Sequence, residues 1–204
     1  MNTRGEVMAK KEEEYLKKLT KAMEEAQSGK RFTHTLGVEY TACALAMKHD
    51  VPLFSAQLAG LMHDCAKCLE DEKLIKICDK NHLSVSEVER RNPYLLHGRV
   101  GAFLAKTKYE VTDEDVLNSI EWHTTGRPGM SALEKIIFIA DYIEPSRKNA
   151  PNLTLVRKMA FEDLDQTMIK ILEDILSYLK SQGGEIDPMT LKTYHYYLGE
   201  KKET

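Results

Sequence analysis

The sequence has few features of membrane, secreted or nucleic-acid-binding proteins. Its most apolar run, IIFIADYI, is interrupted by Asp141 and falls far short of the about 20 apolar residues that span a bilayer. Its first residues, MNTRGEVMAKKEEEYLKK, lack the apolar core of a secretory signal. A formal net charge of −3 gives no overall electrostatic reason to expect nucleic acid. We therefore expect a cytoplasmic protein with no membrane or nucleic-acid partner.

Cysteine is also scarce. The chain contains four cysteines: Cys43, Cys65, Cys68 and Cys78. The spacing of Cys65 and Cys68 is that of a redox or zinc motif, but no strand and turn precede the pair and no second pair completes a zinc site. Reduced thiols are typical of a cytoplasm. We therefore expect the chemistry of the protein to depend on other side chains.

Apolar residues recur every three or four positions through most of the chain, and no segment alternates apolar and polar residues as a strand would. This pattern predicts an all-α fold. A length of 204 residues is consistent with one compact domain, which we divide into an N-terminal amphipathic helical arm (1–27) and a helical bundle (28–204). Helices are predicted over residues 6–27, 31–48, 71–80, 86–91, 94–108, 112–122, 153–181 and 189–198, and two more begin near Pro52 and at Ser131.

Six side chains that are able to bind a metal occur in unusual sequence settings. His63 and Asp64 follow the apolar run AQLAGLM, and Asp141 lies within KIIFIADYI. An ionised carboxylate in such surroundings needs a cation, several donors or a shifted pKa. A salt bridge from Asp141 to Lys67 or Arg147 is the structural alternative. The other three candidates are His34 within a packed helix, His97 beside two glycines and His123 at the end of a helix.

These imidazole and carboxylate donors are spread over five predicted helices, as expected where a bundle builds a metal site from inward-facing side chains. Each histidine taken alone has an ordinary interpretation, namely a ring satisfied by a nearby carbonyl or carboxylate. Neighbours on a helix diverge by about 100°, so His63 and Asp64 would flank an ion, and Asp64 could bridge two. Such donors without thiolate favour iron, manganese or zinc.

The other histidines provide a comparison. His49 and Asp50 form a second His-Asp pair, but it ends a helix with no apolar run around it. We expect this pair at the surface, where a protonated His49 favours the helix dipole. His82 lies in a polar turn and His195 in the aromatic tail YHYY, so we expect both to be structural.

The ordered set H…HD…H…H…D, with HDCAK supplying an HD-x-x-K signature, resembles the HD-domain superfamily of metal-dependent phosphohydrolases. More narrowly, the chain resembles the YqeK family over about residues 28–185, through RFTHTLGVEYTA, LAGLMHDCAK, HGRVGA, EWHTTGRPGMS and KIIFIADYIEPSR. The resemblance implies an HD-domain helical bundle with its metal site between inward-facing helices. It also implies symmetrical hydrolysis of diadenosine tetraphosphate to two ADP molecules by a metal-activated water. Iron, as one or two ions, is the implied cofactor, with manganese or zinc as alternatives.

The resemblance further implies roles for individual residues. A first metal ion would be held by His34, His63, Asp64 and Asp141, whereas His97 and His123 match positions that complete a second metal site or contact phosphates. Asp64 would orient or deprotonate the water, and Lys67 would reach a phosphate from nearly the same helix face. The implied substrate-binding residues are Asp64, Cys65, Ala66, Lys67, His97, His123, Thr124, Gly126 and Arg147.

Other functions stay open at this point. An HD fold also suits hydrolysis of a deoxynucleoside monophosphate or a guanosine alarmone, or oxygenation with two irons, and a non-catalytic nucleotide sensor would keep the same pocket. The late segment DPMTLKTYHYY either covers the nucleotide with a stacked tyrosine or packs as an ordinary C-terminal helix. The amphipathic first helix fits a homodimer as well as packing within one chain.

Overall fold

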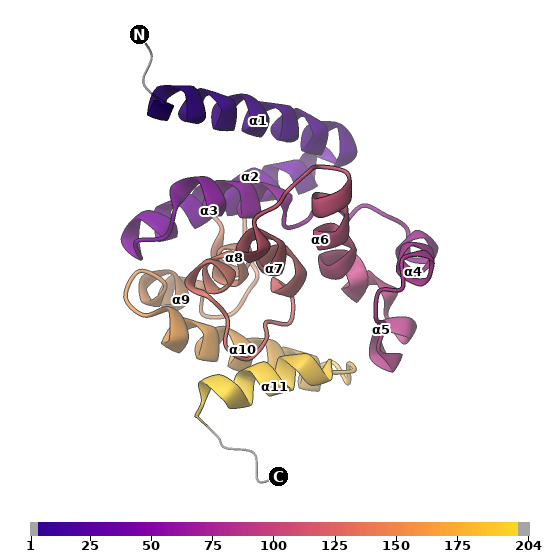
Figure 1. Ribbon diagram of the computed structural model, residues 1–204. Coiled ribbons are helices and arrows are strands. Elements are labelled where there is room, and N and C mark those ends of the chain that lie inside the picture. Colours follow the sequence, from indigo (N-terminus) through magenta and orange to yellow (C-terminus); the bar gives the residue numbers. More distant parts are fainter. Residues whose placement is uncertain (1–3, 200–204) are drawn as a thin grey trace.

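The computed structural model describes residues 4–199, and this part of the chain contains helices and turns but no strand (Figure 1). The helices are α1 (Arg4–Ala26), α2 (Gly29–Lys48), α3 (Leu53–Met62), α4 (Asp71–Lys80), α5 (Glu87–Arg91), the short 3-10 helix η1 (Pro93–Leu96), α6 (His97–Thr107), α7 (Glu114–Trp122), α8 (Ala132–Ile143), α9 (Leu153–Met159), α10 (Leu164–Ser181) and α11 (Pro188–Tyr197). The predicted all-α fold is confirmed. None of these helices combines the length and the apolar composition that crossing a bilayer requires.

The core is built around α8. Its residues Ile136, Ile137, Ile139 and Ala140 are inaccessible to solvent, and α2, α7 and α10 pack against it (Figure 1). α3 pairs with α2 and also contacts α7 and α8. Because α2, α3, α7 and α8 pack as neighbours, they can direct side chains toward a common point.

α2 and α3 cross at close range where Gly60 faces Glu39. A Cβ atom on Gly60 would lie 2.8 Å from the Glu39 Cα and 3.2 Å from its backbone nitrogen, closer than a methyl group can approach. The missing side chain thus sets the spacing of the two helices, three residues before His63. The Glu39 side chain is buried at the same crossing and accepts a 2.8 Å hydrogen bond from Gln57 Nε2.

A smaller apolar cluster lies to one side, where α4, η1 and α6 meet, and consists of Ala66, Leu74, Cys78, Leu96 and Val100. α4 and α5 appear at the right of Figure 1, away from α8. Cys65 packs against the main cluster, whereas its neighbour Ala66 belongs to the smaller one. The connection between α3 and α4, which carries the predicted catalytic residues, therefore runs between the two clusters.

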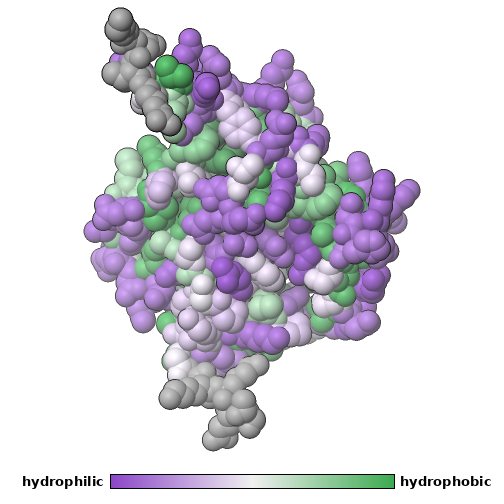
Figure 2. Space-filling model, viewed as in Figure 1, coloured by the Kyte–Doolittle hydropathy of each residue, from purple (hydrophilic) through white to green (hydrophobic). Residues whose placement is uncertain are grey.

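α1 lies across one side of the bundle, with Leu19 and Met23 buried in the main cluster and residues 5–11 exposed (Figure 1). Figure 2 shows hydrophilic residues over much of the visible surface, with hydrophobic residues showing beneath α1. The division into an arm and a bundle at residue 28 stays a prediction.

One predicted helix is divided in the structure. The segment 153–181 forms α9 and α10, separated by residues 160–163. Asp163 causes the new start, because its carboxylate accepts hydrogen bonds of 2.8 and 3.0 Å from two backbone N–H groups in the first turn of α10. Ser131 caps α8, as the sequence predicted, and forms a capping box with Glu134.

Candidate metal centre

Three histidines occupy the same local position, directly after a helical segment, since α3 ends at Met62, η1 at Leu96 and α7 at Trp122. Each ring donates its Nδ1 hydrogen to the carbonyl oxygen three residues earlier. The pairs are His63 with Gly60 at 2.7 Å, His97 with Tyr94 at 2.6 Å and His123 with Ile120 at 2.7 Å. Because a carbonyl can only accept, these bonds place the hydrogen on Nδ1 and leave a lone pair on each Nε2 of the neutral rings.

α3 was predicted to carry His63 and Asp64, but it ends before them. The Gly60 carbonyl, which a continuing helix would offer to the Asp64 N–H, accepts from the His63 ring. Tighter turns follow, with a 3.0 Å bond from the Lys67 N–H to the Asp64 carbonyl. Asp64 and Lys67 thus lie beyond the end of α3, in a turn whose i to i+3 bond keeps the two residues on nearly the same side, as predicted.

His34 lies inside α2 and is oriented by a distant partner. Its Nδ1 lies 3.0 Å from Glu144 Oε1, and Glu144 accepts bonds of 2.6 and 2.5 Å from the Ser146 N–H and hydroxyl. Burial raises the pKa of Glu144, but the bonds from Ser146 and His34 lower it overall. The His34 Nε2 lone pair is thereby directed to Asp141 Oδ1, 3.0 Å away.

Asp141 was predicted to be enclosed by isoleucines, yet 25% of its side chain is exposed. It lies in the last turn of α8 and borders a cleft of about 910 Å³. Arg147 donates to it through Nη2, at 2.6 Å from Oδ1, and through Nε, at 2.9 Å from the backbone oxygen. The sequence left open a salt bridge from Asp141 to Lys67 or to Arg147, and the structure forms the one to Arg147.

The four rings form a row. Their centroids are 5.4 Å apart from His34 to His63, 5.2 Å from His63 to His123 and 4.9 Å from His123 to His97. Asp64 divides its oxygens between the two halves of this row. Oδ2 lies 3.8 and 3.5 Å from the Nε2 atoms of His34 and His63, and Oδ1 lies 3.4 and 3.6 Å from those of His97 and His123.

Two ligand groups result, each with its donor atoms within 4.8 Å of one another: His34, His63 and Asp141, and Asp64, His97 and His123. The buried Nε2 atoms of His34 and His63 make no hydrogen bond within the described part of the chain, and the Nε2 atoms of His97 and His123 lie 3.1 Å apart.

The Asp64 carboxylate is held in its charged form. Burial raises the pKa of Asp64, but His63 and the neighbouring rings hold it well below its usual value. Clustered lone pairs and a carboxylate, without thiolate, fit a divalent metal.

Thr124 and Lys67, both predicted to bind substrate, lie at one end of the row. Thr124 Oγ1 is 3.4 Å from the Nε2 atoms of His97 and His123, and Lys67 Nζ is 3.4 Å from both ring nitrogens of His97. Burial lowers the pKa of Lys67, against the effect of the Asp64 carboxylate. A hydroxyl and an amine therefore adjoin the second ligand group.

Three other predicted contacts are engaged in packing. The Cys65 thiol donates to the Gly101 carbonyl at 3.4 Å, and burial raises its pKa to about 12, so it remains a thiol. The Ala66 side chain is fully buried, which leaves only its backbone to meet a ligand. Gly126 has φ +64°, and a Cβ there would lie 2.7 Å from Thr193 Cγ2 of α11. Contact of these residues with substrate stays a prediction.

Arg31 and Glu144 were missed by sequence reasoning. Arg31 donates from Nη1 to Asp64 Oδ2 at 2.8 Å, one helical turn before His34 on the same face of α2. The spacing of three residues from His34 could have pointed to Arg31. In the same way, Glu144 follows Asp141 by three residues and could have been found from that spacing. Arg31 also lines the 910 Å³ cleft together with Lys30, Arg147 and Lys148. The His34 end of the row thus opens into a cationic cleft.

An all-helical bundle that gathers imidazole and carboxylate ligands from facing helices defines a class of divalent-metal proteins. The model of the HD domain matches residues 31–146, a range that contains all six donors. This match covers more than half of the chain.

The chain is 38% identical over 168 residues to the symmetrical bis(5'-nucleosyl)-tetraphosphatase of Bacillus subtilis (strain 168), covering 82% of this chain and 89% of that protein. It is 40% identical over 172 residues to the protein of the same name from Halalkalibacterium halodurans, covering 84% and 91%. A crystal structure from Clostridium acetobutylicum, of an HD superfamily hydrolase described as involved in NAD metabolism, superposes with a TM-score of 0.87 at 42% identity, covering 91% and 97%. The chain belongs to the HD-domain family, in its group of symmetrical bis(5'-nucleosyl)-tetraphosphatases.

Proposed function

We propose that this protein hydrolyses diadenosine tetraphosphate symmetrically to two molecules of ADP, by attack of a metal-activated water. The observation that carries the proposal is the position of Asp64, which divides its two oxygens between two histidine groups beside a cationic cleft. Support also comes from the Bacillus and Halalkalibacterium relatives, which are named for symmetrical tetraphosphatase activity and align over 82% and 84% of the chain.

We assign the ligands by the two groups of the row. The first ion would be held by His34, His63, Asp141 and Asp64 Oδ2, and the second by His97, His123 and Asp64 Oδ1. Iron is the proposed metal, as one or two ions, with manganese or zinc as alternatives, because mixed nitrogen and oxygen ligands suit all three. When bound, such an ion supplies Lewis acidity and lowers the pKa of a coordinated water.

The protein's own side chains would position the reactants. Asp64 adjoins both ligand groups, so its carboxylate orients the attacking water or accepts its proton. The substrate is a polyanion, and Lys30, Arg31 and Lys148 place positive charge along the cleft that leads to the row. Lys67 adds a cation at the other end. One donor preorganised toward the charge of the transition state is typically worth about 3 kcal/mol of barrier.

The test is product analysis with the metal-loaded protein. Incubation with diadenosine tetraphosphate and separation by ion-exchange chromatography should give ADP as the sole product. ATP together with AMP would contradict the symmetrical cut. A deoxynucleoside monophosphate and a guanosine alarmone serve as competing substrates, and faster turnover of either would assign the site to that nucleotide. Binding of all three without turnover would favour a sensor.

We also propose that the protein is cytoplasmic and forms a homodimer. α1 exposes Val7 and Met8 by 43% and 55%, and such apolar side chains on a protruding helix are suited to a partner helix. Light scattering of the wild type and of Met8→Glu tests the homodimer. A monomeric mass for the wild type would rule it out.

A further inference from the structure

A second, smaller cavity lies at the opposite end of the histidine row from the cationic cleft. It encloses about 170 Å³ between α7 and the N-terminus of α11. Its apolar walls are formed by Leu95, Trp122, Pro188 and Met189, and Thr124 and Thr125 also line it. Trp122 is the single tryptophan of the chain.

Thr124 connects this cavity to the ligand groups. Its hydroxyl lies 3.4 Å from the Nε2 atoms of both His97 and His123, so Thr124 borders both the cavity and the second ligand group. The cleft meets the first group, since His34 and Asp141 are among its lining residues. The two cavities therefore flank the centre, one at each end of the row.

The size and walls of the small cavity suit a flat ring. A cavity of about 150 Å³ with apolar walls accommodates benzene, so 170 Å³ has room for one ring system while a sugar and phosphates remain outside. Trp122 offers an aromatic surface on which a flat ring can stack.

Three carboxylates, Glu89, Glu121 and Asp187, outnumber the two cations, Arg99 and Lys192, around the small cavity, which argues against a phosphate there. The Arg99 guanidinium is held by both oxygens of Glu89, at 2.8 and 2.9 Å, and contacts Glu121 at 3.4 Å. Its charge is thus neutralised locally. An uncharged base fits these surroundings better than an anion.

We infer that this cavity binds the base of one nucleoside of the substrate against Trp122, while the other half of the dinucleotide occupies the cationic cleft. The inference rests on the proposed function. A dinucleoside tetraphosphate has two identical ends, and holding an end on each side of the row places the middle of the tetraphosphate at the ligand groups. Symmetrical cleavage then follows from the positions of the two cavities.

Of the two roles that the sequence left open for the segment DPMTLKTYHYY, its contacts fit packing as a C-terminal helix better than a tyrosine stacked on the nucleotide. Its Pro188 and Met189 line the small cavity, whereas Tyr194 and Tyr197 pack against the main cluster. The aromatic partner of the base comes from α7 instead. α11 thus both packs against the core and closes one wall of the cavity.

The experiment compares steady-state kinetics of the metal-loaded full chain on two substrates. Diadenosine tetraphosphate has a nucleoside at each end, and inorganic tetraphosphate has the same phosphates with no nucleoside. Trp122→Leu should raise KM for the dinucleotide about tenfold, equivalent to about 1.4 kcal/mol, with kcat changed less than twofold. This lies in the range measured for base stacking on aromatic side chains. Trp122→Phe should restore KM, and KM for inorganic tetraphosphate, which has no base to bind, should stay constant throughout.

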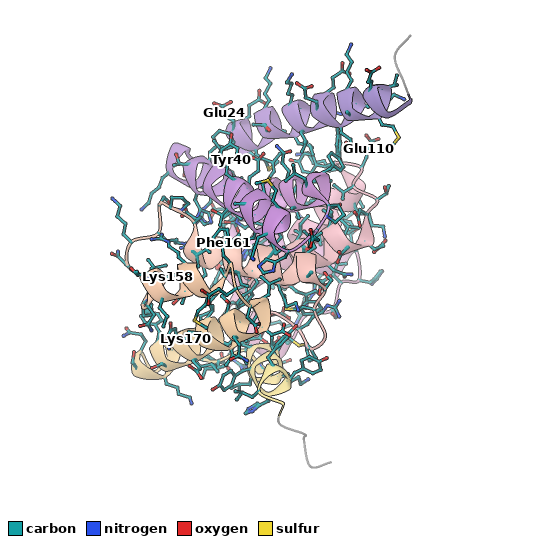
Figure 3. The ribbon with its side chains drawn as sticks, turned by 90° about the vertical axis from the view of Figure 1, so that its left-hand side faces the viewer. Glu24, Tyr40, Glu110, Lys158, Phe161 and Lys170 are labelled. Atoms are coloured by element: carbon teal, nitrogen blue, oxygen red, sulfur yellow. The ribbon has the colours of Figure 1, made fainter. Side chains whose placement is uncertain are left out.

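Two further variants keep the result decisive. Met189→Trp fills the cavity from the α11 side and should also raise KM for the dinucleotide alone, which decides the matter if Trp122→Leu fails to fold. Tyr40→Leu, at an exposed aromatic on α2 labelled in Figure 3, should have no effect. An unchanged KM in folded Trp122→Leu or Met189→Trp, or an equal rise for both substrates, would overturn the inference. Absence of ADP formation by the wild type would instead reject the proposed function.

Discussion

The Nε2 atoms of His97 and His123 face each other at 3.1 Å, although each ring has already donated its Nδ1 hydrogen to a carbonyl. Both side chains are buried. In neutral rings this arrangement opposes two lone pairs where water is excluded, and such a contact costs free energy unless a cation lies between them. Metal binding should therefore relieve a repulsion that folding creates, and the two processes should be linked.

Chelation of the metal should lower the melting temperature, and its return should raise it. At a free metal concentration a thousandfold above Kd, linkage contributes about 4 kcal/mol to the free energy of unfolding. Scanning calorimetry with a chelator and then with iron, manganese or zinc measures this. His97→Ala should show a smaller metal-dependent rise, whereas His82→Ala, at an exposed turn, should match the wild type. Equal rises in both variants would show that His97 is not a ligand.

Asp64→Asn should abolish turnover and most of the bound metal while helical circular dichroism is retained. The substitution removes the charge that both ligand groups share, at a side chain with only 4% exposure. Elemental analysis and ADP release measure the loss. Asp50→Asn is the matched control, because Asp50 belongs to the other His-Asp pair and is exposed. Full activity in Asp64→Asn would exclude the role in positioning the water.

Glu144→Gln should lower metal affinity about 10- to 100-fold, the usual effect of removing a carboxylate that orients a ligand histidine. The His34 Nδ1 hydrogen would lose its charged acceptor, now 3.0 Å away. Competition with a colorimetric chelator gives the affinity. Glu185→Gln, at an exposed partner of Arg91, provides the comparison. An affinity equal to that of the comparison variant would show that His34 does not depend on Glu144.

Gly60→Ala should destabilise the fold by about 1–3 kcal/mol, the usual cost of inserting a methyl group into a packed contact. The added carbon would lie 2.8 Å from the Glu39 backbone, which cannot move without separating α2 from α3. Urea unfolding measures the change. Gly29→Ala is the control, since no atom lies within 4 Å of a Cβ there and alanine favours the first turn of α2 by about 0.5 kcal/mol. Equal stability of the two variants would contradict the close crossing.

Glu39→Gln should stabilise the protein at neutral pH. Burial raises the pKa of Glu39, although its bond from Gln57 opposes this, so the folded state holds this proton more tightly than the unfolded state. Stability is therefore lost as pH rises from the unfolded pKa through the folded one. Glu39→Gln cannot ionise at this position, so it does not lose this stability as pH rises. The difference in stability between the variant and the wild type should therefore fade below the unfolded pKa of Glu39. Melting temperatures measured across acid and neutral pH test this, and a pH-independent difference would contradict it.

The all-α fold could be predicted because apolar periodicity is a local property, and the same holds for the cap at Ser131. Contacts between distant segments could not. His49 was expected at the surface, yet it is half-buried and its Nε2 lies 2.8 Å from the Ala160 carbonyl, 111 residues away. That contact depends on how α2 meets the end of α9, which no pattern within α2 specifies.

The candidate site likewise contains residues that the sequence reveals and residues that only the structure reveals. Its six donors stand out because histidine and aspartate are unexpected in apolar or glycine-rich surroundings, and the structure brings them together. Arg31 and Glu144 carry no such signal, since charged residues near a helix start and in a loop are common. The end of α3 at Met62 was missed for another reason: the bond from the His63 ring to the Gly60 carbonyl competes with the helical ladder, and residue patterns do not reveal such competition.

Three of the four rings take their orientation from the backbone only one turn upstream, and His34 alone relies on a residue 110 positions away. The orientation of these three rings is therefore as durable as the individual helices, while that of His34 depends on how α2 and the chain after α8 are docked. A small shift between those two segments would turn the His34 ring without reorienting the other three, so one ligand of the centre responds to tertiary motion in a way that the others do not.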